Sequence, residues 1–327
     1  MKEFESKKKI LDIFYKNAGN FVSGEDISKK LEVSRASVWK YITKLREDGY
    51  SVDAVPHLGY RITSAPDKLF GYEIDYNLNT KTIGKKGIYH YESVGSTNIR
   101  AYELAEKGEP EGTIVVAESQ THGKGRVGRE WVSPKSGGAY MSLILRPDLE
   151  TDEIPAVTLI AAISAAKAIS GLCELDVKIK WPNDIIINGK KAGGILTEIK
   201  AQPDRVDFLI LGIGINVNTA REKLPRVGTS LKEECRHSVS RTGLVRRFLE
   251  IFEKDYATLK REGFVSLRDE CKAVSSVLGK HVKVTEHHKI VEGRAVDIDE
   301  KGALILKLDD GSRRRVFSGD VAKNQPG

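Results

Sequence analysis

Apolar residues recur at helical spacing three times within the first fifty positions. The first two runs lie around "ILDIF" and "ISKKL". In the third, Val38, Ile42 and Leu45 stand at i, i+4 and i+7, between a Ser34 N-cap and a Gly49 stop signal. The next residues, "YSVDAVPHLGYRI", alternate between apolar and polar in the manner of a small hairpin. Two helices joined by a tight turn and followed by a hairpin predict a winged helix-turn-helix.

The remaining pattern divides the chain into two further segments. "TSAPDK" is the expected linker, and mixed helical and strand patterns then run to about residue 272. Short strands with turn signals at "DEKG" and "DDGS" follow, and "SRRRVF" is expected to be the solvated face of a strand. The pattern predicts an α+β protein: a winged helix-turn-helix over 1–66, a central mixed-sheet domain over 67–272 and a small SH3-like β-barrel over 273–327.

Composition places the chain among soluble proteins of a reducing compartment. It has 327 residues, of which 40% are hydrophobic, and a formal net charge of +7, which permits nucleic-acid or phosphate partners. The apolar run "AVTLIAAISAAKAISGL" is interrupted by Lys167 and is too short to span a bilayer, so we expect a buried helix and no membrane contact. The first ten residues lack the apolar core of a signal peptide. Cys173, Cys235 and Cys271 have neither metal nor disulfide spacing, so we expect a cytoplasmic protein without a metal site.

The stretch "GKGRVGREW" contains the G-x-G-x-x-G spacing of a dinucleotide-binding loop. A strand, "TIVVAES", precedes it, but no helix follows to receive a pyrophosphate; "VSPKSGG" leads instead into another strand. We therefore reject a Rossmann loop and predict a glycine-rich loop between strands that carries Lys124, Arg126 and Arg129. Its cations suit a lid that orders over an anion, although a solvated surface loop is an equal alternative at this stage.

Three more stretches of the central segment favour a binding site. Ser96 or Thr97 is expected to cap a helix that ends at Gly108, and a helix start with hydroxyls can also hold a carbonyl or an anion, although plain capping is the simpler interpretation. In "KIKWPND", Lys180 ends an alternating strand beside a proline, where a fixed ammonium could stabilise developing negative charge; an ordinary surface lysine is the alternative. "LGIGINVN" predicts a buried strand whose glycines leave space for a ligand or for tight packing.

The N-terminal segment has its own candidate function. In a helix-turn-helix the second helix enters the major groove, and its outward positions near the N-terminus are Arg35, Ser37 and Lys40. A small helical domain that binds protein or only covers the fold is the alternative. We favour DNA binding because helix order, turn and hairpin all agree.

The motifs together resemble those of biotin protein ligases. "STN", "ESQTHGKGRVGREW", "KWPND", "KKAGGILTE" and "GIGINVN" occur in the order seen in that family. The resemblance covers the whole chain, and the winged helix is similar to that of the bifunctional type, the biotin operon repressor. It implies a central domain of class II synthetase type, biotin and ATP as substrates, and Mg²⁺ on the triphosphate. Biotin would be activated to biotinyl-5′-AMP and passed to a lysine of a biotin carboxyl carrier protein, a subunit of acetyl-CoA carboxylase.

The resemblance also implies roles for individual residues. Those expected to bind biotin are Ser96, Thr97, Asn98, Gln120, Lys124, Gly125, Arg126 and Lys180. Lys180 is the expected catalytic residue, holding the junction of carboxylate and phosphate in both steps. The adenylate would be covered by a loop that includes Gly123, Lys124, Arg126 and Arg129, and adenine by the segment 229–234. The family commonly has G-R-G-R where this chain has G-K-G-R, so Lys124 lacks the bidentate fork of arginine.

A regulatory role follows from the same resemblance. Adenylate-loaded central domains pair in the family, so we expect a homodimer that binds a two-fold operator and represses genes of biotin synthesis and uptake. Three other interpretations stay open from the residues: a ligand-sensing regulator without catalysis, a lipoate ligase, and a protein-interaction module with structural glycines. The intact "KWPND" motif argues against a regulator without catalysis. The winged helix and the basic loop argue against a lipoate ligase, and the clustered cations argue against a protein-interaction module.

Overall fold

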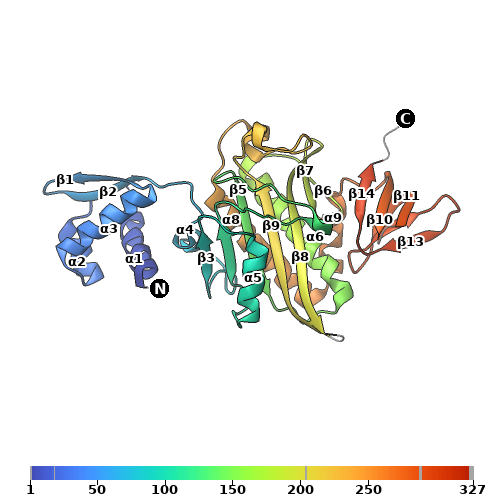
Figure 1. Ribbon diagram of the computed structural model, residues 1–327, viewed down its shortest axis with the longest axis horizontal. Coiled ribbons are helices and arrows are strands. Elements are labelled where there is room, and N and C mark those ends of the chain that lie inside the picture. The colour runs from blue at the N-terminus through green and yellow to red at the C-terminus, as the bar shows by residue number, and fades with distance from the viewer. Residues whose placement is uncertain (1, 18, 203–204, 287–288, 324–327) are drawn as a thin grey trace. The chain divides into compact units, whose positions relative to one another are not determined.

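The computed structural model describes residues 2–17, 19–202, 205–286 and 289–323. Contacts between residues divide the chain into two compact units, Met1–Tyr76 and Asn77–Gly327. Figure 1 labels the helices and strands of both units.

The N-terminal unit is the predicted winged helix-turn-helix. Ser23 and Ser34 cap the two helices of the motif through their hydroxyls, and Gly49 ends the second at a positive φ of 104°. The predicted Ser34 cap and Gly49 stop signal are therefore confirmed. The elements are α1 (Lys2–Lys16), α2 (Gly24–Leu31), α3 (Arg35–Asp48), β1 (Ser51–Val55), β2 (Gly59–Ser64) and α4 (Gly71–Asp75).

The short helix α4 belongs to this unit through a buried carboxylate. Glu73 is 8% exposed and accepts hydrogen bonds from the hydroxyls of Tyr15, at 2.6 Å, and Tyr50. Burial, together with the nearby Glu73 charge, raises the pKa of both tyrosines, so they stay protonated donors. Lys8 of α1 forms an ion pair with Asp75 of α4. The hairpin and α4 contribute residues to the same hydrophobic core.

The second unit is built on a mixed sheet, as the sequence predicted, and this sheet has seven described strands. Its order is β3-β4-β5-β9-β8-β7-β6; β3 and β4 are parallel and every other neighbouring pair is antiparallel. The strands are β3 (Ile88–Tyr91), β4 (Ile114–Ala117), β5 (Gly138–Leu145), β6 (Val177–Lys180), β7 (Asp184–Ile187), β8 (Lys190–Gln202) and β9 (Arg205–Asn216).

Helices cover both faces of this sheet (Figure 1). On one face lies α5 (Thr97–Glu106), in a core with Val115, Ile144 and Ile210. The opposite face carries α6 (Ile154–Cys173) and α8 (Arg241–Glu262), which pack against each other. By length and composition alone the helix α6 could cross a membrane, so the expectation that this run is too short was wrong, but most of it is buried inside the unit. This confirms the predicted buried alanine-rich helix.

The chain ends in a separate antiparallel sheet within the same unit. Two short helices, α7 (Leu231–Cys235) and α9 (Val265–Ala273), precede it along the chain. The five strands run in the order β13-β12-β11-β10-β14, which confirms the expected small β domain. They are β10 (His281–Glu286), β11 (Lys289–Ile298), β12 (Leu304–Lys307), β13 (Arg313–Val316) and β14 (Asp320–Lys323). The three arginines of β13 are exposed, as expected for a solvated strand face.

Candidate functional site

A pocket lies where the start of α5, the basic loop and the middle of β8 and β9 meet. It brings together all but two of the residues that the sequence analysis nominated in the central domain, the exceptions being Gly123 and Lys180. Its lining residues are Ser96, Thr97, Asn98, Gln120, Lys124, Gly125, Arg126, Arg129, Glu130, Trp131, Asn183, Asp184, Lys191, Gly194, Ile195, Leu196, Gly212, Ile213, Gly214 and Asp320.

The start of α5 supplies the polar end of the pocket. Ser96 stands at the N-cap position, but its side chain makes no capping hydrogen bond. The carboxamide oxygen of Gln120 takes that role: it accepts from the Thr97 backbone N–H at 2.8 Å and from the Thr97 hydroxyl at 3.1 Å. The other end of the carboxamide donates to Ser133 at 2.8 Å. Capping by the hydroxyl of Ser96 or Thr97 was therefore wrong in detail, and three hydrogen bonds to two residues hold Gln120 in one orientation.

Asn98 is fixed as firmly, and a glycine makes room for it. Its amide donates to Glu198 at 2.7 Å, and its carbonyl oxygen accepts from the Ser142 hydroxyl at 2.6 Å. A Cβ on Gly212 would lie 2.1 Å from that carbonyl oxygen, so only glycine lets the side chain lie across β9. The close approach predicted for "LGIGINVN" is thus made by a side chain that lines the pocket.

The second glycine of that strand accommodates Trp131. A Cβ on Gly214 would come within 2.6 Å of the indole nitrogen. The ammonium of Lys191 lies 5.4 Å from the centre of the indole ring and forms an ion pair with Asp184 at 2.6 Å. Such a cation over an aromatic face holds both groups in place. Trp131, Lys191 and Asp184 belong to the motifs that resemble the family, but no role was predicted for them, because no local signal indicates that they meet.

The basic loop connects β4 to β5 and contains no α-helix, which confirms that it is not a Rossmann loop. Its middle is one three-residue 3-10 turn, Arg126–Gly128. Lys124 pairs with Glu198 at 3.0 Å, and Arg129 pairs with Asp320 of β14. Arg126 donates to the Asn183 carboxamide and to the Gly319 carbonyl, both at 3.1 Å.

Arg126 is the most enclosed of these three cations. Burial lowers the pKa of its guanidinium, and the nearby carboxylates of Asp320 and Asp184 oppose that shift. An arginine keeps its charge under these conditions. The pocket therefore contains a fixed positive charge next to groups that donate hydrogen bonds, an arrangement suited to an anionic ligand.

Lys180 lies at the end of β6, as predicted. The strand alternates, with Val177 and Ile179 buried and the two lysines on the other face. Lys180 is opposite Asp184 in the ladder, but it is not among the described residues that line the pocket, and within the described chain its ammonium forms no hydrogen bond or ion pair. The motif reaches the pocket through Asn183 and Asp184 instead.

Two further features border the pocket. Beside it lies a more apolar pocket that shares Trp131 and Lys191 with it and adds Pro225, Val227 and Asn216. The Asn216 amide donates to the Thr229 carbonyl at 3.0 Å, at the start of the segment expected to cover adenine. Among the described residues, no group of three or more His, Cys, Asp or Glu side chains is arranged to hold a metal ion.

In the N-terminal unit, the three nominated residues lie on α3 but differ in what they contact. Arg35 pairs with Glu25 at 2.7 Å, and the Ser37 hydroxyl lies 3.0 Å from that of the capping Ser34. Lys40 is exposed. Trp39, which was not nominated, is 58% exposed on the same helix.

Comparison with known proteins agrees with this geometry. Residues 91–216 match the model of the "Biotin/lipoate A/B protein ligase family", residues 6–61 match an "HTH domain" and residues 277–323 a "Biotin protein ligase C terminal domain". The chain is 39% identical over 319 residues to the bifunctional ligase/repressor BirA of Bacillus subtilis, covering 96% of this chain and 98% of that one. It is 33% identical over 225 residues to the biotin–[acetyl-CoA-carboxylase] ligase of Paracoccus denitrificans, covering 65% of this chain and 90% of the relative.

A solved structure extends the agreement to the fold. The biotin protein ligase from Aquifex aeolicus in complex with biotin and ATP superposes with a TM-score of 0.64 at 30% identity, covering 72% of this chain and 98% of that one. The three domain matches account for the winged helix, the mixed sheet and the C-terminal strands described above. The chain therefore belongs to the biotin/lipoate A/B protein ligase family, with a helix-turn-helix domain before the ligase fold and a biotin protein ligase C-terminal domain after it.

Proposed function

We propose that this chain activates biotin with ATP and transfers the biotinyl group to a lysine of a biotin carboxyl carrier protein, a subunit of acetyl-CoA carboxylase. The observation that carries the proposal is the pocket itself, where a fixed Arg126, two further cations of the same loop and the polar start of α5 converge. The near full-length similarity to a bifunctional ligase/repressor supports it.

The first step joins two anions. A carboxylate oxygen of biotin attacks the α-phosphorus of ATP, an O–P bond forms, and the bond to pyrophosphate breaks to give biotinyl-5′-AMP. Positive charge near the reacting oxygens lowers the repulsion and stabilises the charge that develops. Lys124 and Arg126 supply it from the loop, and Lys180 is the proposed catalytic residue at the end of β6. We propose that ATP enters with Mg²⁺ on its triphosphate.

In the second step the amine of the carrier lysine attacks the carbonyl carbon of the mixed anhydride. A C–N bond forms, AMP leaves with the electron pair of the C–O bond, and the amine loses a proton to solvent. An acyl-adenylate hydrolyses easily, so a cover that excludes water is useful. We assign this cover to the loop that contains Gly123, Gly125 and Arg129.

The two pockets suggest how the substrates are divided. Ser96, Thr97 and Gln120 offer fixed donors and acceptors for the ring or carboxylate of biotin. Asn98 is fixed by Glu198 and Ser142 and is proposed to bind biotin at the same site. The more apolar pocket beside Trp131 suits the adenine base, with the segment 229–234 at its border.

The N-terminal unit is proposed to bind operator DNA as a repressor of biotin genes, with Arg35, Ser37 and Lys40 on the groove helix. We further propose a cytoplasmic protein that makes no membrane contact and forms a homodimer when loaded with the adenylate. The proposed domain limits are 1–66, 67–272 and 273–327, although α4 extends the compact N-terminal unit to Tyr76. Sedimentation equilibrium with and without biotin and ATP tests the dimer. Unchanged association in both conditions would remove the regulatory part of the proposal.

The enzymatic part is tested by incubating the protein with ATP, Mg²⁺, biotin and a purified carrier domain. Intact-mass measurement is expected to find one biotinyl group on the carrier lysine, and none when that lysine is replaced by arginine. Lipoylation in place of biotinylation would favour a lipoate ligase. No transfer of either acid would favour a ligand-sensing regulator without catalysis.

A further inference from the structure

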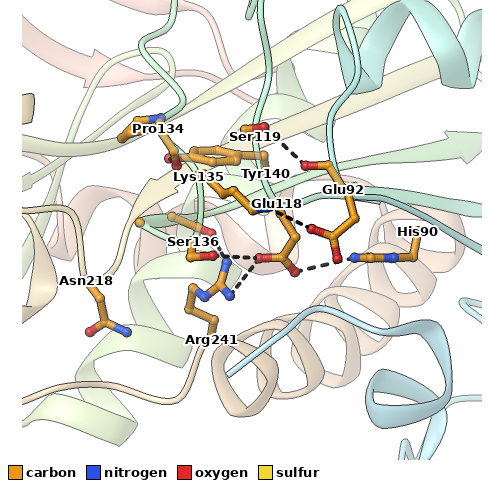
Figure 2. Close-up of polar contacts among 12 residues, drawn as sticks. His90, Glu92, Glu118, Ser119, Pro134, Lys135, Ser136, Tyr140, Asn218 and Arg241 are labelled. Carbon is orange, nitrogen blue, oxygen red and sulfur yellow. Dashed lines mark hydrogen bonds and ion pairs between the residues drawn. The ribbon is translucent and has the colours of Figure 1, made fainter. Parts of the chain in front are cut away.

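A buried ion pair lies behind the basic loop, outside the pocket. Glu118 and Arg241 are both fully buried, and their side chains meet at 2.8 Å although 123 positions separate them in sequence. Figure 2 shows the guanidinium of Arg241 pointing at the carboxylate of Glu118, with His90 on its other side. The His90 ring lies 3.4 Å from that carboxylate.

This pair ties together the two ends of the loop. Glu118 directly follows β4 and precedes Gln120 by two residues, so it stands where the loop leaves the sheet. Its backbone carbonyl accepts from the Ser136 N–H at 3.0 Å, and its carboxylate lies 3.4 Å from the Ser136 hydroxyl. Arg241 also donates to the Gly138 carbonyl at 3.2 Å, where the loop re-enters the sheet in β5. The guanidinium of Arg241 therefore contacts both ends of the loop.

Neighbouring contacts fix the same two ends. The Thr219 hydroxyl donates to the Gly137 carbonyl at 2.9 Å, and the Tyr140 hydroxyl donates to the Pro134 carbonyl at 3.2 Å. On the other side, Lys135 pairs with Glu92 at 3.2 Å, as Figure 2 shows. The base of the loop is thus a rigid frame, whereas Val127 at its tip is 78% exposed.

Stability alone does not explain two buried charges at this point. Removing charges from water is costly, and a well-packed apolar pair of similar size is often at least as stable. The guanidinium also fixes geometry, because its planar group donates hydrogen bonds to two acceptors at fixed angles. Here the two acceptors, the Glu118 carboxylate and the Gly138 carbonyl, lie at the two ends of one loop.

We infer that Arg241 and Glu118 are positioning residues for the ligase reaction. They set the spacing of the loop ends so that Gln120 meets the start of α5 and Arg126 reaches the pocket. Neither residue is among those that line the pocket, and the inference rests on the proposed function of the pocket. Because Arg241 is the first residue of α8, the helix and the loop are fixed to each other.

Two variants separate positioning from stability. Glu118→Leu combined with Arg241→Met removes both charges and leaves an apolar pair that keeps the core filled. Arg241→Lys keeps the charge but cannot donate in two fixed directions. We expect both variants to release biotinyl-5′-AMP at least about tenfold faster than the unaltered protein does. This is the change in rate that the loss of one charge-assisted hydrogen bond produces. Trypsin is also expected to cleave after Lys124 and Arg126 faster in each variant without ligand.

Asp255→Asn is the matched control. Asp255 is a buried acid of the same helix that contacts Ser164 and Lys167, away from the loop. We expect it to lower the melting temperature without changing adenylate release or cleavage of the loop. Folded variants at Glu118 and Arg241 that release the adenylate and resist trypsin like the unaltered protein would overturn the inference. Failure of the unaltered protein to bind biotinyl-5′-AMP would instead overturn the proposed function, and the inference with it.

Discussion

Replacing Gly212 by alanine tests whether the pocket depends on the position of Asn98. The added Cβ would lie 2.1, 2.8 and 2.9 Å from the three terminal atoms of the Asn98 side chain, distances that real Cβ atoms do not tolerate. The side chain cannot yield without loss, because Glu198 holds its amide and Ser142 holds its carbonyl oxygen. We therefore expect Gly212→Ala to displace Asn98 from the pocket wall.

The size of the effect follows from those two hydrogen bonds. A neutral bond contributes about 0.5–1.5 kcal/mol and one to a charged group about 1.5–3 kcal/mol, so losing both costs about 2–4.5 kcal/mol of unfolding free energy. We expect biotin affinity to fall about ten- to hundredfold, because the start of α5 moves with Asn98. Urea denaturation measures the first quantity and isothermal titration calorimetry the second.

A double-mutant cycle identifies the cause. In an Asn98→Ala background the clash no longer exists, so Gly212→Ala is expected to change stability by less than about 0.5 kcal/mol. Gly194→Ala is the stability control, because a Cβ there meets Lys191 and Trp131 at 3.4 Å or more, which is ordinary contact. Equal losses from Gly212→Ala in both backgrounds would refute the reasoning.

Four further predictions concern separate parts of the molecule. Arg126→Ala removes the loop's hydrogen bonds to two other segments, so we expect the variant to release the adenylate faster. The released adenylate is expected to biotinylate bystander proteins, which a streptavidin blot detects. Unchanged release would count against the loop as a cover. Lys180→Ala is expected to slow adenylate formation by orders of magnitude while calorimetry still detects biotin binding, and near-normal turnover would end its catalytic role. Glu73→Gln replaces the carboxylate that Tyr15 and Tyr50 contact by a neutral amide, so circular dichroism is expected to find the melting temperature of the N-terminal unit lowered by several degrees; an unchanged melting temperature would mean that this carboxylate adds no stability. Lys40→Ala is expected to weaken operator binding in fluorescence anisotropy more than Arg35→Ala does, because Arg35 is already paired within the unit, and the reverse order would contradict that assignment.

Features with a local cause could be predicted from the sequence. The helix α3 follows from its apolar spacing, its Ser34 cap and Gly49, and all three are confirmed. The dipeptide Asn188-Gly189 favours a tight hairpin turn, and both residues have a positive φ, 48° and 77°. The basic loop was distinguished from a Rossmann loop because no helical pattern follows it, and the structure agrees.

Features that join distant residues could not be predicted in this way. The contacts of Asn98 with Glu198 and of Glu118 with Arg241 each span about a hundred positions or more, and neither partner carries a local signal for the other. The cap of α5 was assigned to Ser96 or Thr97 from preference alone, whereas the tertiary structure brings Gln120 to the same donors. Lys180 was placed on its strand by alternation, but the alternation does not say how the following residues turn toward the pocket.

The central claim is that this chain activates biotin as an adenylate. It is tested most directly by biotin-dependent exchange of labelled pyrophosphate into ATP, with purified protein and Mg²⁺ and without a carrier protein. Our account predicts exchange with biotin, none with lipoate, and a strong loss of exchange in Lys180→Ala. No exchange with either acid would contradict the claim and leave a ligand-sensing regulator as the better description of the protein.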